Sequence, residues 1–545
     1  MALIRRRAGV LVIAAFAAFL TVPGAAQADG ATSVRPVRAC EDLIRTYDIP
    51  KTTAHVETAK LVPATATEPE HCDVSGYVEA AVQFRVKLPT TTYTGRYLQL
   101  GCGGFCGVIE DPAFPKDCLP RGGQFAVAAT DDGHVGTGAF PMGDGTWAAN
   151  NQAARDDYFY RAPHVVSLAS KKIIATFYGN APKHSYFSGC SNGGREALLL
   201  AQRYPDDFDG IVAGAPAAYM GPLVLHQAWL SRSNTAADGS SILTPAKLPV
   251  LHNAVLKACD SVDGLADGQI DDPRRCDFDP DTVRCAGADQ PTCLTAAQVD
   301  AAKKLYAGPT DERGRRLYPG GESYGSELAW NGWVLPFPGV GSVSAILADN
   351  GLKHIFYPIG KPSSSLADVK FTRAEFDRLT AEGHKANALS LDLDAFRRAG
   401  GKLVLWHGWS DEAIPPLGTL DYYQRLTQRS GGPARTQQWA RLFMPPSMFH
   451  CAGGDTLTEF DPLKETAAWV ERGHAPERVI ATGRDSQGQV TRTRPVFPYP
   501  LRARYDGSGS VDDASNFVPA PPSAPLNDAI DWVGTYLHHI PGPRA

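Results

Sequence analysis

Tyr186-Phe187-Ser188-Gly189-Cys190-Ser191-Asn192-Gly193-Gly194-Arg195 is the stretch of sequence that decides the fold. It contains Gly-x-Ser-x-Gly, the nucleophile-elbow pattern, in which a serine lies on a sharp turn between a strand and a helix. An apolar run precedes the pattern and a helical run, 196–204, follows it. Such a turn strains the backbone of Ser191, so only small residues fit at Gly189 and Gly193. An ordinary glycine-rich loop between a strand and a helix is the alternative interpretation.

Two residues far downstream match the partners that such a serine needs. A serine hydroxyl is a weak nucleophile, so it requires an imidazole base, and a carboxylate must orient that base. Asp411 follows a predicted strand at 403–406, and His450 follows another at 437–444. The chain order Ser191, Asp411, His450 is the order found in α/β-hydrolases. His407 and His134 are alternative bases, although a structural role suits each of them equally well.

Two cysteines single out His450 among these histidines. Cys190 directly precedes Ser191, and Cys451 directly follows His450. If the serine and the histidine meet, the two sulfur atoms become neighbours. A disulfide between them would hold the hydrogen bond from the serine to the histidine at about 3 Å. The alternative is that both cysteines are buried or paired elsewhere.

The rest of the chain predicts an α/β fold with a long insertion. Strands are predicted at 78–86, 96–100, 123–130 and 210–216, and helices at 156–178 and 528–539, while 40–72 is predicted to be a short helix and loop. Alternating strands and helices indicate a mostly parallel sheet that is covered on both faces. From about 218 to 395 this alternation is lost. The predicted organisation is a signal peptide at 1–28, a catalytic domain at 29–217, a lid domain at 218–395, and the rest of the catalytic domain at 396–545.

A glycine-rich loop follows the predicted strand at 96–100. Its sequence runs from Gly101 to Gly107 and is typical of an oxyanion loop, in which backbone N–H groups face the developing negative oxygen. We expect Gly103 or Gly104, together with the N–H group of Asn192, to form the oxyanion hole. A plain turn is the alternative.

Composition and cysteine content restrict the class of protein. The chain has 545 residues, a formal net charge of −5 and eleven cysteines. Residues 1–28 combine Arg5, Arg6 and Arg7 with a short apolar run and a small-residue cleavage site, which is typical of a secretory signal. A mildly acidic secreted protein is a poor match for a nucleic-acid-binding protein, and no later run is typical of a membrane span. Export favours disulfides. Local spacing suggests three pairs, Cys40–Cys72, Cys259–Cys276 and Cys285–Cys293. It also suggests one further disulfide between two of the residues Cys102, Cys106 and Cys118, without indicating which two.

An acidic run within the insertion is a candidate metal site. Residues 260–271 carry aspartates at spacings of three and four, with two glycines that permit tight turns. Clustered oxygen ligands suit Ca²⁺, although the spacing differs from that of an EF-hand loop. Cys259 and Cys276 flank the run. A solvated acidic turn is the alternative.

Taken together, these motifs resemble the tannase and feruloyl esterase family, to which mono(2-hydroxyethyl) terephthalate hydrolase is also similar. The shared features are Cys190-Ser191, Asp411, His450-Cys451 and the stretches at 103–105, 203–210, 401–411 and 505–510. The resemblance implies an α/β-hydrolase fold with a large inserted lid and hydrolysis of aromatic-acid esters. It also implies a structural Ca²⁺ in the lid, with these ligands: the side chains of Asp260, Asp263 and Asp267 and the backbone carbonyls of Leu265 and Gln269. Phe497 and Pro519 stand where relatives often carry a cysteine pair.

We therefore predict a secreted serine esterase that acts on small aromatic esters. Lid aromatic residues could stack on the ring of the acid, and the predicted pocket residues are Trp330, Trp333, Phe356 and Ile414. The alternatives are a terephthalate-monoester hydrolase, an acyltransferase or peptidase on the same scaffold, and a non-catalytic calcium-dependent binding protein. The sequence does not indicate an oligomeric state or the particular acid.

Overall fold

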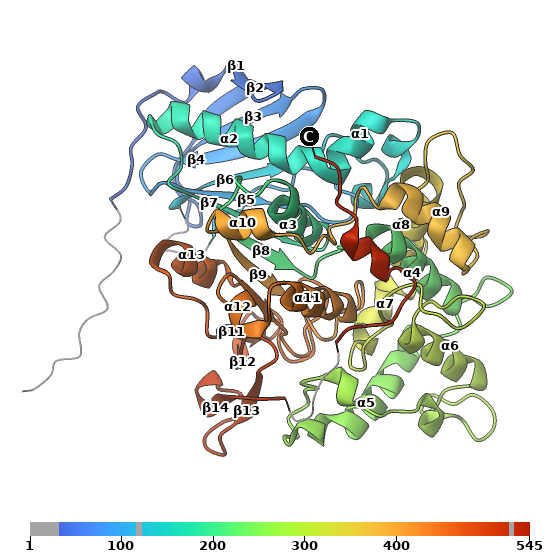
Figure 1. The fold of residues 1–545 in the computed structure, drawn as a ribbon. Coiled ribbons are helices and arrows are strands. Elements are labelled where there is room, and N and C mark those ends of the chain that lie inside the picture. Colours follow the sequence, from blue (N-terminus) through green and yellow to red (C-terminus); the bar gives the residue numbers. More distant parts are fainter. Residues whose placement is uncertain (1–31, 116–122, 523–527, 545) are drawn as a thin grey trace, which may run out of the picture. The chain divides into compact units, whose positions relative to one another are not determined.

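A sheet of ten strands organises the fold, with the strand order β1-β2-β3-β4-β6-β5-β7-β8-β9-β10 (Figure 1). The computed structural model describes residues 32–115, 123–522 and 528–544. The predicted signal peptide and Cys118 lie outside these described residues. Six neighbouring strands pair in parallel: β6 (Phe125–Thr130), β5 (Arg96–Leu100), β7 (His184–Cys190), β8 (Gly210–Gly214), β9 (Lys402–Trp406) and β10 (Ala440–Phe443). These strands are short apolar runs, as expected for strands covered on both faces.

An antiparallel extension continues the sheet beyond β6. It consists of β1 (Thr46–Ile49), β2 (Thr52–Val62), β3 (His71–Val78) and β4 (Val82–Pro89), and β4 pairs with β6. Two expectations are corrected here. The segment 40–72 is mainly strand, because its many β-branched residues favour extended backbone. The predicted strand at 78–86 is in fact a hairpin, because Val78 pairs with Val82 and residues 79–81 form the turn.

Helices cover both faces of the sheet, as predicted. On one face, α2 (Ala162–Tyr178), α3 (Asn192–Arg203) and α11 (Leu417–Arg429) contribute to the largest hydrophobic cluster. On the other face, α13 (Leu463–Arg472) packs with the hairpin of β11 (Val479–Arg484) and β12 (Val490–Val496) in a second cluster. The remaining elements here are α1 (Gln152–Asp156), α12 (Pro433–Thr436), β13 (Arg502–Tyr505) and β14 (Phe517–Ala520). The predicted helix at 528–539 is only a 3-10 turn at Thr535–His539, since Gly534 directly precedes it and is a poor helix former.

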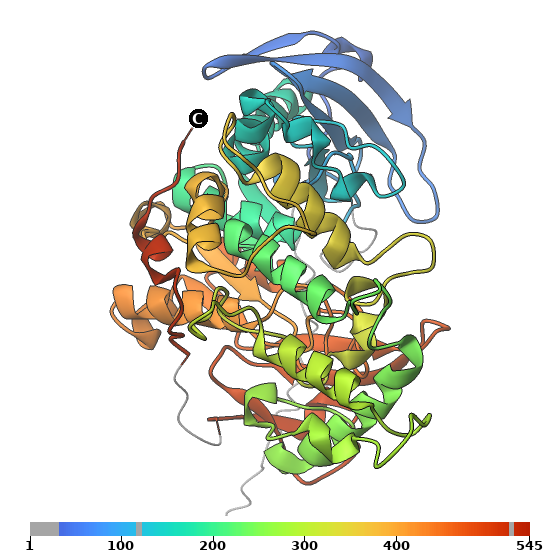
Figure 2. The same ribbon diagram turned by 90° about the vertical axis from the view of Figure 1, so that its right-hand side faces the viewer.

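The regular elements that the structure describes between β8 and β9 are helices, and none of this segment adds a strand to the central sheet. It carries α4 (Met220–Ser233), α5 (Leu248–Cys259), α6 (Ala296–Ala307), α7 (Trp330–Trp333), α8 (Val343–Asn350), α9 (Arg373–Gly383) and α10 (Asp394–Arg398). A third hydrophobic cluster lies wholly within residues 230–335. Figure 2 shows these green and yellow helices on the side of the sheet that faces the viewer. The domain boundaries at 218 and 395 stay a prediction.

The register of the parallel strands brings distant segments to one edge of the sheet. Cys190 pairs with Gly214, Gly214 with Trp406, and Trp406 with Phe443, each at the carboxyl end of its strand. In open α/β sheets, ligands bind outside these carboxyl ends. The residues that follow β7, β9 and β10, including Ser191, Asp411 and His450, therefore start from a common edge.

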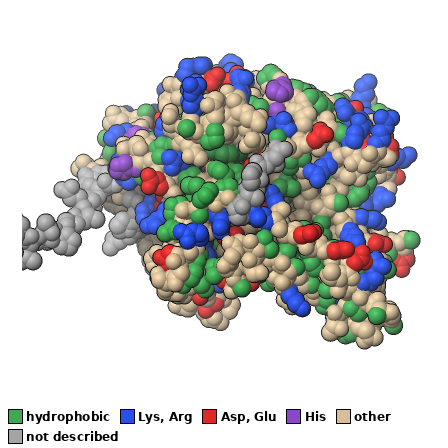
Figure 3. All heavy atoms as spheres, turned by 60° about the horizontal axis from the view of Figure 1, so that its bottom comes forward, with side chains coloured by type: hydrophobic (Ala, Val, Ile, Leu, Met, Phe, Trp, Pro, Cys, Tyr) green, Lys and Arg blue, Asp and Glu red, His purple; other side chains and the backbone are tan. Residues whose placement is uncertain are grey.

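Among the described residues, none of the helices has the length and apolarity needed to cross a lipid bilayer. The face shown in Figure 3 carries basic and acidic side chains interspersed with one another. This face therefore lacks the single-sign charge field that attracts a polyanion.

Candidate active site

Ser191 lies on the turn between β7 and α3 in a strained backbone conformation, with φ +64° and ψ −122°. A non-glycine residue in this region is uncommon and marks a site where the surrounding structure enforces the geometry. A Cβ atom added at Gly189 would lie 2.5 Å from the backbone of Gly193, and one added at Gly193 would lie 3.0 Å from Gly101. A side chain at Gly189 would clash with the backbone, and one at Gly193 would require the backbone of Gly101 to move, which explains the Gly-x-Ser-x-Gly pattern.

The structure brings His450 and Asp411 together. Nδ1 of His450 lies 2.8 Å from Oδ2 of Asp411. The other oxygen of Asp411 accepts hydrogen bonds from the backbone N–H groups of Ala413 and Ile414, at 2.9 and 2.7 Å. Burial alone would raise the pKa of Asp411, but the neighbouring imidazoles of His450 and His407 outweigh it and hold this pKa well below its ordinary value. Asp411 is therefore an anion that orients the imidazole of His450.

The same contacts set the charge of the imidazole. Burial lowers the pKa of His450, but the charge and hydrogen bond of Asp411, together with the charge of Glu412, raise it above its ordinary value. Glu412 accepts a hydrogen bond from the backbone N–H of His450 at 3.1 Å. Burial and the charge of Asp411 raise the pKa of Glu412 itself to about 7. Glu412 is an ionisable neighbour of the base that the sequence pattern did not reveal.

His407, the first alternative base, is a second partner of Asp411. Its Nε2 lies 3.1 Å from Oδ2 of Asp411 and 2.8 Å from the carbonyl oxygen of Ile414. Its Nδ1 lies 2.8 Å from Oγ1 of Thr419. The ring is fully buried and both nitrogens have partners. We therefore interpret His407 as a structural residue that helps to hold the carboxylate of Asp411 in place.

His134, the second alternative base, contacts Trp147 and the backbone of Phe105. Its ring stacks on Trp147 with the centroids 3.7 Å apart, and its Nε2 donates to the carbonyl oxygen of Phe105 at 2.7 Å. Burial lowers its pKa to about 4. We interpret His134 as a structural histidine.

A disulfide joins Cys190 to Cys451, with the Cα atoms 5.8 Å apart. Ser191 and His450 line the same pocket beside this bond. Cys102 pairs with Cys106, a choice that the sequence left open, and the remaining pairs are the three suggested by local spacing: Cys40–Cys72, Cys259–Cys276 and Cys285–Cys293.

The predicted oxyanion residues Gly103, Gly104 and Asn192 all line this pocket. Gly104 requires glycine, because its φ is +56° and an added Cβ would lie 2.4 Å from the carbonyl oxygen of Met142. The side chain of Asn192 points into a buried network. Its Nδ2 donates to Glu196 at 2.6 Å, and its Oδ1 accepts from Nε of Arg195 at 2.7 Å. The N-terminus of α3, which carries the N–H of Asn192, is thereby fixed.

This network contains the one group of possible metal ligands that the described residues bring within 4.8 Å of one another: Cys102, Cys106, Asp132 and Glu196. Because the two cysteines are joined in a disulfide, they do not offer the thiolates that a metal ion would bind. Burial raises the pKa of Glu196 to about 7, and burial together with the charge of Glu196 raises that of Asp132 well above its ordinary value. Burial therefore favours the protonated form of both carboxyl groups next to the loop at 101–107.

The pocket around Ser191 has a volume of about 590 Å³. Of the four predicted pocket residues, Trp333 and Ile414 line it. Trp330 and Phe356 do not, because both are fully buried in hydrophobic clusters, which corrects their prediction. The sequence did not reveal the lining residues from α4, from α8 and from the loop before α1: Met220, Leu223, Val224, Gln227, Val343, Leu347, Phe140 and Met142. Apolar runs with helical spacing were the available signal, but any buried helix shows them.

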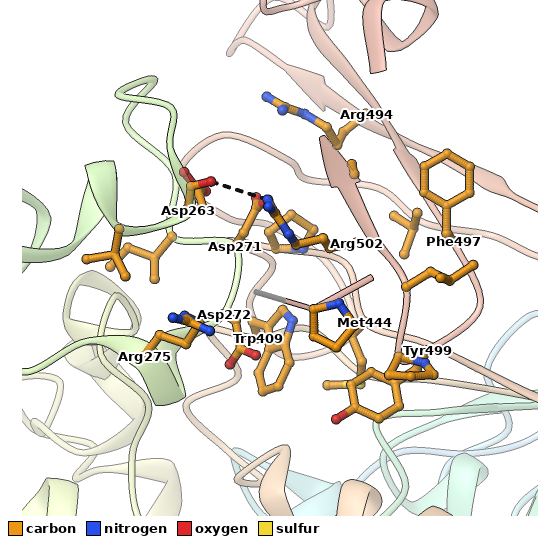
Figure 4. A pocket seen from close by; sticks show the side chains of 18 of the residues that line it. Asp263, Asp271, Asp272, Arg275, Trp409, Met444, Arg494, Phe497, Tyr499 and Arg502 are labelled. Atoms are coloured by element: carbon orange, nitrogen blue, oxygen red, sulfur yellow. Dashed lines mark hydrogen bonds between the residues drawn. The ribbon is translucent and has the colours of Figure 1, made fainter. Parts of the chain in front are cut away.

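The acidic run forms a loop closed by the Cys259–Cys276 disulfide. The carboxylate of Asp260 accepts hydrogen bonds from the N–H groups of residues 267–269, and Asp267 forms an ion pair with Arg494 at 2.6 Å. Asp263 and Asp271 line one pocket with Arg502, which donates to the carbonyl oxygen of Asp263 at 3.2 Å (Figure 4). Burial, with the charge of Asp271, raises the pKa of Asp263 to about 7. The predicted ligand set consists of oxygen atoms, which suit a hard cation. In the structure, however, Asp260 and Asp267 already have these other partners, and the three predicted carboxylates are not among the groups that the described residues bring within 4.8 Å of one another.

Comparison with known proteins adds an independent line of evidence. A model of the family described as "Tannase and feruloyl esterase" matches residues 66–520. An uncharacterized esterase of Xanthomonas campestris pv. campestris is 34% identical over 89% of this chain and 92% of its own length. The mono(2-hydroxyethyl) terephthalate hydrolase of Piscinibacter sakaiensis is 35% identical over 84% and 87%. The crystal structure of feruloyl esterase B from Aspergillus oryzae superposes with a TM-score of 0.75 at 26% identity, over 87% of this chain and 98% of that one.

Proposed function

The chain belongs to the tannase and feruloyl esterase family and is a carboxylic ester hydrolase that acts on aromatic-acid esters, and we propose that Ser191, His450 and Asp411 carry out its reaction. The observation that carries this proposal is the Cys190–Cys451 disulfide beside the pocket that Ser191 and His450 both line. The contact between His450 and Asp411 supports the pairing of base and orienting carboxylate, and the shared pocket supports Ser191 as the nucleophile.

The proposed reaction has two halves. Ser191 attacks the ester carbonyl while His450 takes the proton of the hydroxyl, and Asp411 stabilises the imidazolium that forms. The backbone N–H group of Asn192 and that of Gly103 or Gly104 stabilise the oxyanion. His450 then protonates the leaving alcohol, and water repeats the same steps on the acyl-enzyme to release the acid.

The shape and lining of the pocket support an aromatic acyl group. Trp333, Phe140 and Leu223 provide apolar surface on which an aromatic ring can pack. We favour hydrolysis over acyl transfer to another alcohol because the named activities in the family are hydrolytic.

The test replaces Ser191 by alanine and follows the hydrolysis of methyl ferulate. We expect turnover to disappear while the circular dichroism spectrum and melting temperature stay those of the unchanged protein. A fluorophosphonate should label the unchanged protein once per chain, and Ser191→Ala should not be labelled. Continued hydrolysis by a folded Ser191→Ala variant would overturn the assignment of the nucleophile.

We also propose that the loop at 260–271 binds a structural Ca²⁺. The side chains of Asp260, Asp263 and Asp267 and the backbone carbonyls of Leu265 and Gln269 would hold the ion. Its charge would offset the repulsion that helps to raise the pKa of Asp263, and it would fix the loop between the lid and β12. The ion takes no part in the proposed chemistry.

We further propose that the protein is exported. Five disulfides join described cysteines, and disulfides form and persist in oxidising compartments. This supports the secretory signal expected at 1–28. Fractionation of a culture that expresses the full chain would test the proposal, and retention of the protein in the cytosol would contradict it.

A further inference from the structure

The charges of the pocket around Ser191 restrict the acids that it can accept. Among the described residues that line it, none is lysine or arginine. The ionisable lining groups are His450, which serves as the base, and Glu110, which lies at an exposed position and carries a carboxylate. The described lining therefore offers no cation for a substrate anion, and Glu110 adds a like charge at an exposed position.

The two side-chain amides of the described lining, those of Gln227 and Asn192, are already engaged. Nε2 of Gln227 donates to the carbonyl oxygen of Ala413 at 2.6 Å, and its Oε1 accepts from Nε1 of Trp333 at 3.0 Å. The amide of Asn192 is committed to Glu196 and Arg195. Neither amide can turn toward a substrate carboxylate without breaking contacts with buried groups, which is costly.

Building on the proposed function, we propose that this esterase selects esters of uncharged aromatic acids and rejects those whose ring carries a second, ionised carboxylate. An isolated carboxylate that enters an apolar pocket loses its hydration and gains no partner. The monoester of terephthalate is the plainest example of a rejected substrate. Rejection arises from desolvation and from the repulsion by Glu110, so an otherwise identical neutral ring is accepted.

Two substrates of the same shape separate the effect of the ring carboxylate's charge from the effect of its size. Monomethyl terephthalate carries a carboxylate at neutral pH, and methyl 4-carbamoylbenzoate carries an uncharged carboxamide at the same ring position. Each kcat/KM is divided by the rate constant of the same ester in hydroxide, which removes the electronic effect of the substituent. We expect the normalised kcat/KM of the amide to exceed that of the acid by at least about 30-fold, because desolvating an ion costs far more than desolvating an amide.

Variants of the pocket test the cause. Leu347→Arg places a cation on α8 facing the pocket, and Leu347→Met changes the side chain without adding a charge. We expect Leu347→Arg to reduce the amide-to-acid ratio at least about tenfold, while Leu347→Met keeps the ratio of the unchanged protein. Glu110→Gln, at an exposed position, should reduce the ratio severalfold and keeps the test available if the arginine variant does not fold.

The outcomes separate this inference from the proposed function. Normalised rates that agree within about threefold, both abolished by Ser191→Ala, would overturn the charge selection and leave the proposed nucleophile intact. A ratio that neither Leu347→Arg nor Glu110→Gln changes would also overturn it. If the unchanged protein hydrolyses neither ester, both the inference and the aromatic ester activity fail.

Discussion

Cys190 and Cys451 are bonded to each other across 261 residues of sequence, and each is the immediate neighbour of a residue proposed to react. The bond joins the end of β7 to the loop after β10, two segments that the sheet already brings to one edge. The backbone near the bond is constrained at both ends, since Ser191 and Cys451 both have positive φ values of 64°. We infer that the disulfide fixes the separation of nucleophile and base more finely than strand pairing alone.

Replacing both cysteines by serine should therefore impair catalysis more than stability accounts for. We expect kcat to fall at least about tenfold in Cys190→Ser/Cys451→Ser, because small displacements of reacting groups cost large factors in rate. The matched control is Cys40→Ser/Cys72→Ser, which removes a disulfide at β3. It should lower the melting temperature and leave kcat within about twofold. Equal losses of kcat in the two variants would contradict a positional role.

The acid limb of the pH profile should depend on Glu412. His450 acts as a base only when neutral, so kcat/KM falls as the pH drops through its pKa. The negative charge of Glu412 helps to raise that pKa. Glu412→Gln keeps an oxygen for the N–H of His450 but removes the charge, so the pKa falls and the limb moves to lower pH by about half a unit or more. The exposed variant Glu477→Gln should leave the limb in place, and an unmoved limb in Glu412→Gln would refute the coupling.

The elbow, the order of its partners and the Cys190–Cys451 pair could be predicted because each depends on residues adjacent in sequence. The pocket could not, because its lining depends on how α4 and α8 pack against the sheet. Trp330 and Trp333 illustrate the difference. At a spacing of three they would share a face of a regular helix, but Gly332 between them has a φ of +90° and breaks it. Trp330 enters the third hydrophobic cluster, and Trp333 reaches the pocket.

The contacts that buried polar residues make could not be predicted from the sequence either. His407 and Asp411 are four residues apart, yet nothing in the sequence showed that both His407 and His450 would contact one carboxylate. The hairpin at Val78–Val82 was missed for a related reason. The apolar residues on either side of its turn resemble one continuous strand, and only cross-strand pairing shows where the chain reverses.

Glu196 should make the protein less stable as the pH rises. Burial raises its pKa from 4.5 to about 7 in the folded state, so between these values the folded chain holds a proton that the unfolded chain releases. The free energy of unfolding therefore decreases with rising pH over this window, by up to about 3 kcal/mol for this group. Glu196→Gln cannot ionise but can still accept the hydrogen bond from Asn192. Urea titrations at pH 5 and pH 8 should show a smaller loss for Glu196→Gln than for the unchanged protein, and equal losses would refute the assignment.

Removal of calcium should destabilise the fold around the loop at 260–271 without changing the chemistry. An ion that binds the folded loop stabilises the fold in proportion to its occupancy, so a chelator should lower the melting temperature by at least about 5 °C. Ca²⁺ should restore it and Mg²⁺ should not, because Mg²⁺ gives up its water ligands reluctantly and demands octahedral geometry. The matched variant is Asp263→Asn, which removes one proposed ligand charge but keeps the size of the side chain. Its melting temperature should already be low and should respond to neither chelator nor Ca²⁺. If the unchanged protein melts at the same temperature with and without chelator, the aspartates at 260–271 form a solvated acidic loop and the proposed metal site is wrong.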